Sequence, residues 1–228
     1  MSAPTPHSAV SEAAKPAGPG RPKDLGKRAA ILDVAKRLFT QHGFDRVSMD
    51  QIAAEAGVSK LTVYSHFGDK ESLFSAAIRE KCEEQMPQAL FLEGLEGNLR
   101  EQLTAIARAF FALVTSDEAI AMHRMMMLPG TGDSHVRELY WQSGPRLVKE
   151  AFGEFLRSRQ ARGELHVPDI ERAASQFFCL LKGEVHMQML CGMCCESQMD
   201  DIDTHIAATV DLFLRAHTGA TAGQEQPV

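Results

Sequence analysis

Apolar residues recur at a helical spacing near the N-terminus of this chain, and glycines interrupt the pattern at short intervals. In the first segment, Leu38 and Phe39 follow Val34 and Ala35 by one helical turn, and the run ends at Gly43. Side chains three or four positions apart lie on one face of an α-helix, and glycine is a common helix stop. The segment therefore predicts an amphipathic helix, and the breaks that follow limit the next helices to short ones.

Each of the next three segments begins with a residue type that caps helices. Ser48, followed three positions later by Gln51, is a capping-box pattern, and Ser59 and Asp69 can each accept a hydrogen bond from the first turn of a helix. Gly57 separates the first two segments. The predicted helices cover residues 49–56, 60–66 and 70–86. Short helices are stable mainly through packing on one another, so the pattern predicts a compact helical unit.

Beyond Pro87 the helical period continues, with glycine and proline at the breaks. No segment alternates between apolar and polar residues as a strand would. Further helices are predicted over residues 98–116, 118–128, 134–143, 146–162, 169–190 and 200–217. We therefore expect an all-α protein. Its expected parts are a tail (1–24), a small N-terminal domain (25–72), a larger helical domain (73–217) and a second tail (218–228).

Charge is divided unevenly along the chain, although the formal total is −6. Residues 1–81 carry 12 Lys and Arg against 9 Asp and Glu, whereas the remainder carries 12 against 21. Arg21, Lys23, Lys27 and Arg28 stand close together, as expected of an arm that meets phosphate groups, although a solvated tail has the same composition. Only the N-terminal third therefore suits a nucleic acid.

Composition predicts a soluble protein of the cytoplasm with no membrane partner. Hydrophobic residues make up 44% of the chain, but no apolar run approaches the roughly 20 residues of a membrane span. The first residues lack the apolar core of a secretory signal. The five cysteines do not form an evenly spaced disulfide framework, which favours a reducing compartment.

The second and third predicted helices, joined at Gly57, match a helix-turn-helix. Ala53 is informative because closely crossing helices leave no room for a larger side chain, and Gly57 can adopt the positive φ of a sharp turn. The inward positions are Ile52, Ala53, Ala56, Val58 and Val63. The outward positions of the third helix are Lys60, Leu61, Thr62, Tyr64, Ser65 and His66. This mixture suits base edges and phosphates in a major groove, although spacing alone also fits a plain three-helix bundle.

The local sequence closely resembles the DNA-binding domain of the TetR family of regulators. The resemblance is carried by Phe39, HGF at 42–44, IA at 52–53, AGVS at 56–59, VYSHF at 63–67 and DKESLF at 69–74. It implies a homodimeric transcription regulator, usually a repressor, with an N-terminal three-helix helix-turn-helix domain that binds palindromic operator DNA. The larger C-terminal helical domain would bind a small effector and form the dimer. The implied DNA contacts are Ser48, Lys60, Thr62, Tyr64, His66 and Lys70.

Lys70 and the basic arm each have a further reason to contact DNA. Lys70 falls in the first turn of a helix, where backbone N–H groups and the helix dipole attract a phosphate. The segment Gly20 to Lys23 resembles the basic arm of many relatives, in which Arg21 and Lys23 would enter a minor groove. Leu61 stands where many relatives have a small residue or proline. We include it among the expected groove contacts, but because of this departure the family does not indicate an operator sequence.

The C-terminal part is expected to contain the dimer interface. Residues 156–192, with GELHVPD and AASQFF, are similar to the ligand-binding domain of an AefR-like branch of the family. In such proteins the last two long helices pair with their symmetry mates in a four-helix bundle. The apolar positions expected there are Ala173, Phe177, Leu180, Leu181, Val185, Ile206, Val210, Phe213 and Leu214. The alternative is that these residues are buried against their own chain.

Methionine is abundant in the C-terminal part, and its adaptable side chain suits a pocket for apolar ligands. The candidate effector-binding residues are Phe110, Met122, His123, Met126, Trp141, Phe178 and His186. The two histidines would orient a polar end of the ligand, although Met and His at helical spacing are also ordinary core residues. A small apolar or amphipathic molecule bound there is expected to release the DNA.

Three other functions are compatible with parts of the sequence. Cys191, Cys194 and Cys195 lie near His186 and suggest a metal or thiol sensor, but zinc sites usually draw on two separated ligand pairs and a second cysteine-rich pair is missing. A cysteine with a histidine is also the core of some enzymes, yet none of the common catalytic motifs accompanies it. A DNA-binding protein without sequence preference is the third. We expect no cofactor, no metal and no catalytic residue, and whether the cysteines sense metal or oxidants stays open.

Overall fold

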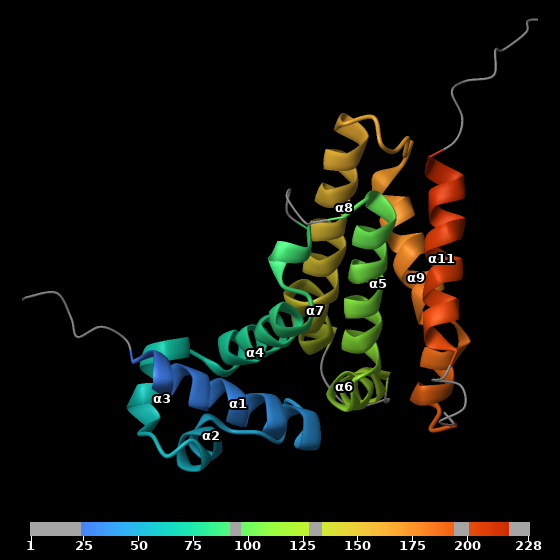
Figure 1. The fold of residues 1–228 in the computed structure, drawn as a ribbon. Coiled ribbons are helices and arrows are strands. Elements are labelled where there is room, and N and C mark those ends of the chain that lie inside the picture. The colour runs from blue at the N-terminus through green and yellow to red at the C-terminus, as the bar shows by residue number, and fades with distance from the viewer. Residues whose placement is uncertain (1–23, 92–96, 128–133, 194–200, 219–228) are drawn as a thin grey trace, which may run out of the picture.

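The computed structural model describes residues 24–91, 97–127, 134–193 and 201–218, and these residues form helices and no strand (Figure 1). The expected all-α fold class is confirmed. The elements are α1 (Leu25–His42), α2 (Met49–Glu55), α3 (Lys60–Phe67), α4 (Lys70–Gln85), the 3-10 helix η1 (Gln88–Phe91), α5 (Leu99–Thr115), α6 (Asp117–Met127), α7 (Ser134–Ser143), α8 (Pro145–Ala161), α9 (Ile170–Leu190) and α11 (Ile202–His217). In the described ranges, none of these helices combines the length and apolar character needed to span a bilayer.

The short N-terminal helices begin at the caps that the sequence predicts. Ser48, Ser59 and Asp69 each accept a hydrogen bond from the backbone N–H three positions on, at 3.1, 3.1 and 2.7 Å. Of the predicted capping box at Ser48, the half that forms is the bond from the Gln51 backbone N–H to the Ser48 hydroxyl, and the Gln51 side-chain N–H donates to Glu55 at 3.2 Å. The start of each helix is therefore determined locally, before tertiary packing is considered.

Helices α1 to α4 share one hydrophobic core. Ile31 of α1, Ile52 of α2 and Val63 of α3 are fully buried in it. Met122 of α6 and Val136 of α7 belong to the same cluster. The core of the N-terminal helices therefore continues into the C-terminal part, so a displacement of α6 or α7 would be felt directly by the helices that carry the helix-turn-helix.

The helices α5, α8, α9 and α11 lie side by side and enclose a second, aromatic core (Figure 1). Phe152 of α8 stacks on Phe177 of α9 with 4.8 Å between ring centroids, and Phe213 of α11 meets Phe177 edge to face at 5.0 Å. Phe110 of α5 stacks on Phe178 at 4.2 Å. These ring pairs join all four helices, and large buried rings of this kind contribute strongly to stability.

Most of the apolar residues expected at a dimer interface are instead buried within this chain, which corrects that expectation. The residues of that set that lie below the surface are Ala173, Phe177, Leu181, Ile206, Val210, Phe213 and Leu214. Val185 packs against the same core, and Leu180, with 44% of its surface exposed, is the one residue of the set that faces solvent. The reason is that α9 and α11 each turn their most apolar stripe toward α5 and α8.

Helix α9 is not the continuous helix that the sequence predicts, because it is kinked at Gly183. The backbone there has φ of 51° and ψ of −157°, a conformation that side-chain-bearing residues rarely adopt. His205 Nε2 of α11 lies 3.1 Å from the carbonyl oxygens of both Leu180 and Leu181, just before the kink. Because carbonyl oxygens only accept, this nitrogen carries the proton. A neighbouring helix thus hydrogen-bonds to the backbone beside the kink.

Candidate DNA-binding and effector sites

Helices α2 and α3 are joined by a tight turn that has the expected geometry. Gly57 has φ of +64°, as the sequence predicts for this position. The Val58 N–H donates to the Ala53 carbonyl at 3.0 Å, and Ala53 itself has only 4% of its surface exposed. A larger side chain at Ala53 would have to displace α3, so the small residue and the glycine together set the angle at which α3 leaves the turn.

Helix α3 presents a mixed polar and apolar face to solvent. The exposed residues of this face are Lys60, Leu61, Tyr64 and Ser65. Leu61 has 79% of its surface exposed, an unusual position for a leucine without a partner. Thr62 and His66, which the sequence also predicts to point outward, are half-buried, and the Thr62 hydroxyl lies 2.8 Å from the hydroxyl of Ser59. The freely accessible part of the face is therefore narrower than predicted.

Lys60 is held in place by residues of both helices of the motif. Its ammonium lies 2.7 Å from the Asp50 carboxylate of α2 and 5.8 Å from the centre of the Tyr64 ring. The hydrogen bond to Asp50 raises the pKa of Lys60, which keeps the amine charged. A phosphate or base edge that binds the Lys60 ammonium must replace the Asp50 carboxylate. An exposed ion pair of this kind contributes little free energy, so it is easily replaced.

Lys70 bonds to the protein as well as facing the surface. Its ammonium donates to the backbone carbonyls of Phe44 at 3.0 Å and Val47 at 3.1 Å, and it lies 4.2 Å from the centre of the Phe44 ring. These bonds tie the start of α4 to the segment that leads into Ser48. The predicted basic-arm residues Arg21 and Lys23 lie outside the described residues.

A cavity of about 710 Å³ lies between the N-terminal helices and the C-terminal helices. The expected effector residues Phe110, Met122, His123, Trp141 and Phe178 line it. Two expected residues do not: Met126 packs against the N-terminal core, and His186 is buried behind His123, with 5.4 Å between the two rings. The structure brings five of the seven together from four helices.

Helices α1 and α4 contribute a wall of this cavity that the sequence does not predict. Lys36 and Thr40 of α1 line it, as do Ile78, Lys81 and Cys82 of α4. An amphipathic helix with one apolar face gives no sign that its polar edge also faces a cavity, so no local signal could have identified these residues. Burial raises the pKa of the Cys82 thiol to about 11, which keeps it protonated at neutral pH.

A neutral polar pair lies in this mainly apolar cavity. The Tyr140 hydroxyl and His123 Nε2 are 2.7 Å apart. Burial, and then the charges of His186 and Lys182, lower the pKa of His123 to about 4. Burial also raises the pKa of Tyr140. Both groups are therefore uncharged at neutral pH and share one hydrogen bond, which leaves hydrogen-bonding capacity for a ligand.

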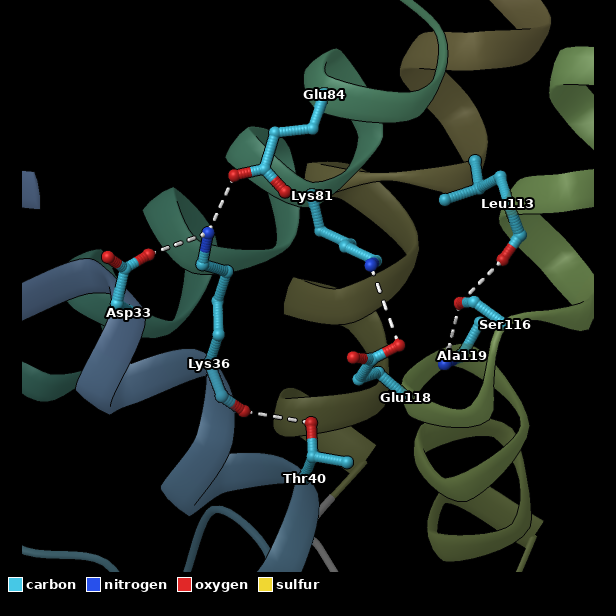
Figure 2. A network of polar contacts seen from close by, with 9 residues as sticks. All are labelled: Asp33, Lys36, Thr40, Lys81, Glu84, Leu113, Ser116, Glu118 and Ala119. Atoms are coloured by element: carbon cyan, nitrogen blue, oxygen red, sulfur yellow. Dashed lines mark hydrogen bonds and ion pairs between the residues drawn. The ribbon is translucent and has the colours of Figure 1, made fainter.

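Ion pairs connect the helices around the cavity (Figure 2). The Lys36 ammonium of α1 lies 3.2 Å from Asp33 and 2.7 Å from Glu84, the two pairs drawn in Figure 2. It also lies 3.0 Å from Glu80. Burial alone would lower the pKa of Lys36, but hydrogen bonds to these carboxylates outweigh it and raise the pKa. Lys36 thus joins α1 to α4.

The same cavity wall continues from α4 to α6 through a second ion pair. The Lys81 ammonium of α4 lies 3.5 Å from Glu118 near the start of α6 (Figure 2). Ser116 caps that start, accepting from the Ala119 N–H at 3.3 Å. A chain of polar contacts therefore runs from α1 through α4 to α6 along the cavity.

The cysteines form no metal site in the part of the chain that the structure describes. No group of three or more His, Cys, Asp or Glu residues is placed there to hold a metal ion. Cys191 is exposed with a free thiol, whereas Cys194 and Cys195 lie outside the described residues.

Two family profiles match this chain. Residues 31–77 match the profile described as bacterial regulatory proteins of the tetR family, and residues 101–218 match the C-terminal domain of AefR-like transcriptional repressors. The HTH-type transcriptional repressor ComR of Escherichia coli is 31% identical over 172 residues, which are 72% of this chain and 80% of ComR.

Solved structures agree with the sequence relatives. The flavonoid-responsive regulator FrrA is 29% identical, with a TM-score of 0.67 over 86% of this chain and 98% of FrrA. A TetR-family regulator from Mesorhizobium loti has the same fold, with 23% identity and a TM-score of 0.69 over 85% of this chain and 97% of that chain. These relatives are DNA-binding regulators and not enzymes. This chain belongs to the TetR family of bacterial transcriptional regulators, and its C-terminal half is of the AefR-like repressor type.

Proposed function

We propose that this protein represses transcription as a homodimer that binds a palindromic operator through α3 and is released by a small amphipathic molecule. The observation that carries the proposal is the exposed face of α3, where Lys60, Leu61 and Tyr64 project from a helix anchored at its start by Ser59. A rigid helix with donors and apolar groups on its outer face can enter a major groove and reach base edges.

The contacts are divided between reading and positioning. Lys60, Thr62, Tyr64 and His66 of α3 read the bases, and Leu61 packs on a thymine methyl group. Ser48 and Lys70 contact phosphates: two N–H bonds of the Lys70 ammonium are already used, and an ammonium has a third. Arg21 and Lys23 contact the minor groove.

The dimer forms through the outer faces of α9 and α11. One recognition helix reads only a few base pairs, so affinity and specificity require two half-sites and therefore two subunits. Leu180 and Met187 of α9 and Leu212 of α11 have 44%, 58% and 53% of their surfaces exposed. Ala208 of α11 is also exposed. Large apolar side chains on outer helix faces favour an interface with a second copy.

The effector binds in the cavity between the N-terminal and C-terminal helices. A volume of about 710 Å³ with mainly apolar walls suits a small organic ligand. FrrA, whose name states that it responds to flavonoids, is similar over nearly its whole length, which supports an organic effector for this chain. Because a bacterial repressor must reach its operator DNA, we place the protein in the cytoplasm.

The cavity offers a direct route from the effector to the DNA-binding helices. Its walls include α1 and α4, which the Lys36 and Lys81 ion pairs join to each other and to α6. A ligand that separates these helices changes the orientation of α3. A coupling free energy of about 1–3 kcal/mol would lower operator affinity roughly 5- to 150-fold, and DNA would weaken ligand binding by the same factor.

The first experiment measures DNA binding by fluorescence anisotropy. The DNA upstream of the gene is searched for an inverted repeat, and the full repeat is compared with a half-site and with random DNA. We expect Lys60→Ala and Thr62→Ala to change the preference among operator variants by about 1–3 kcal/mol per base contact. Lys70→Ala should weaken all DNA alike and lower the salt slope by about one.

A matched control and a contrary outcome complete this test. Arg172→Ala removes an exposed charge at the start of α9 and should leave affinity for every DNA unchanged. If the half-site binds as tightly as the full repeat, or if every α3 variant loses equal affinity for operator and random DNA, α3 does not read an operator.

A further inference from the structure

The acidic residues that line the cavity are already paired with lysines. Asp33 and Glu84 bond to Lys36, and Glu118 bonds to Lys81. A cationic ligand would therefore have to break one of these pairs to gain a carboxylate partner. Breaking a partly buried pair leaves a charge uncompensated, which opposes binding.

Two cations in the same cavity have no such partner. Lys149 of α8 and Lys182 of α9 line the cavity and are half-buried, and neither forms an ion pair or hydrogen bond with any described residue. The charge left over in the cavity is therefore positive. An apolar cavity with unpaired ammonium groups favours an anion over a neutral or cationic ligand.

Lys182 acts on the polar pair that lies in this cavity. Burial lowers the pKa of His123 and His186 first, and the Lys182 charge lowers both further, so its positive field reaches the two rings. His123 Nδ1 is buried and has no hydrogen-bond partner among the described residues. When the Tyr140 hydroxyl donates to Nε2, the neutral ring carries its proton on Nδ1. His123 and the unpaired Lys182 therefore line the same cavity.

Building on the proposed function, we propose that the effector is an amphipathic organic anion whose carboxylate-type group is bound by Lys182, in the cavity that the neutral His123–Tyr140 pair also lines. Lys182 supplies both the charge and the hydrogen-bond donors. The apolar body of the ligand packs against the Phe110 and Phe178 rings. An alkyl chain and an aromatic ring system share this chemistry.

The test compares acids with uncharged amides of the same shape. The probes are decanoate with decanamide and 2-naphthoate with 2-naphthamide, so the two pairs also distinguish an alkyl from an aromatic body. Binding is followed by fluorescence of Trp141, the single tryptophan, which lines the cavity, and by calorimetry. We expect at least one acid to bind about tenfold or more tightly than its amide, because hydrogen bonds to charged groups are the stronger ones.

Variants assign this preference to Lys182. Lys182→Met keeps a side chain of similar length without the charge and should remove the acid preference while leaving amide binding unchanged. Lys182→Arg should retain the preference, and Lys27→Met, an exposed lysine of α1 that does not line the cavity, should behave as the wild type. Circular dichroism checks that each variant is folded.

The outcomes separate this inference from the proposed function. Equal affinity for acid and amide, no saturable binding of either acid up to about 1 mM, or an equal loss of both ligands in Lys182→Met overturns the organic-anion effector. The operator assay without ligand tests the proposed function independently. If DNA binds its operator while the acids do not bind, only this inference fails. If the acids bind with the expected preference but operator affinity never changes, the anion site stands and the effector role fails.

Discussion

At the scale of single residues, neighbours supplied by the fold determine what a side chain does. The family resemblance makes Lys70 a phosphate contact, but its ammonium also holds the carbonyls of Phe44 and Val47. Lys70 is therefore a positioning residue for the segment that presents Ser48, as well as a candidate DNA contact. His123 shows the same dependence, because burial makes an ordinary histidine neutral across the physiological range.

The low pKa of His123 predicts a pH-dependent stability. Burial, His186 and Lys182 lower the pKa from 6.5 to about 4, so between these values the unfolded chain binds a proton that the folded chain does not. The free energy of unfolding therefore falls as the pH falls through this window. As the pH falls through this window, we expect the free energy of unfolding of His123→Asn, measured in urea, to fall by on the order of 2 kcal/mol less than that of the wild type. Parallel losses in both proteins would assign the acid sensitivity to other groups.

At the scale of helices, neighbouring residues in the sequence determine where a helix begins, whereas contacts between helices depend on residues far apart in the chain. The caps at Ser48, Ser59 and Asp69 are readable from sequence because each bond spans three residues. The one reciprocal capping box of the described helices, Asn98 with Glu101 at the start of α5, follows the same local rule, with Asn in place of Ser or Thr.

The connection between α1 and α4 gives an element-scale prediction. Lys36 neutralises Asp33, Glu80 and Glu84, so Lys36→Met leaves three carboxylates close together without their shared cation. We expect a loss of about 1–2 kcal/mol in the free energy of unfolding, reduced at high salt because ions screen the repulsion.

Arg37→Met is the matched control for this prediction, since Arg37 is an exposed neighbour on α1 with the single partner Glu55. Its loss should be at most about 1 kcal/mol. Equal losses in the two variants, or a loss for Lys36→Met that salt does not reduce, would show that the shared cation does not hold α1 against α4.

At the scale of the whole molecule, the two faces of α9 and α11 have different surroundings. The inner stripes close the aromatic core, and the outer faces carry Leu180, Met187 and Leu212 in contact with solvent. Exposed leucines and a methionine on neighbouring long helices predict where a second copy binds.

The double variant Leu180→Glu with Leu212→Glu tests this interface. Two carboxylates per subunit at a desolvated interface oppose association, so sedimentation at micromolar concentration should show a monomer where the wild type is a dimer. Leu61→Glu changes a more exposed leucine, on α3, and should remain dimeric while losing operator affinity. A double variant that stays dimeric would place the interface elsewhere.

The sequence by itself determined the helices, the helix-turn-helix with its small residue at Ala53 and its turn at Gly57, and the family. These features depend on periodicity, capping and backbone conformation, which act within a few residues. Only the tertiary structure decided which stripe of α9 is internal, where Gly183 kinks that helix, and that α1 and Lys182 line the same cavity. Such outcomes depend on contacts between residues far apart in the chain, and an amphipathic helix does not encode which neighbour covers its apolar face.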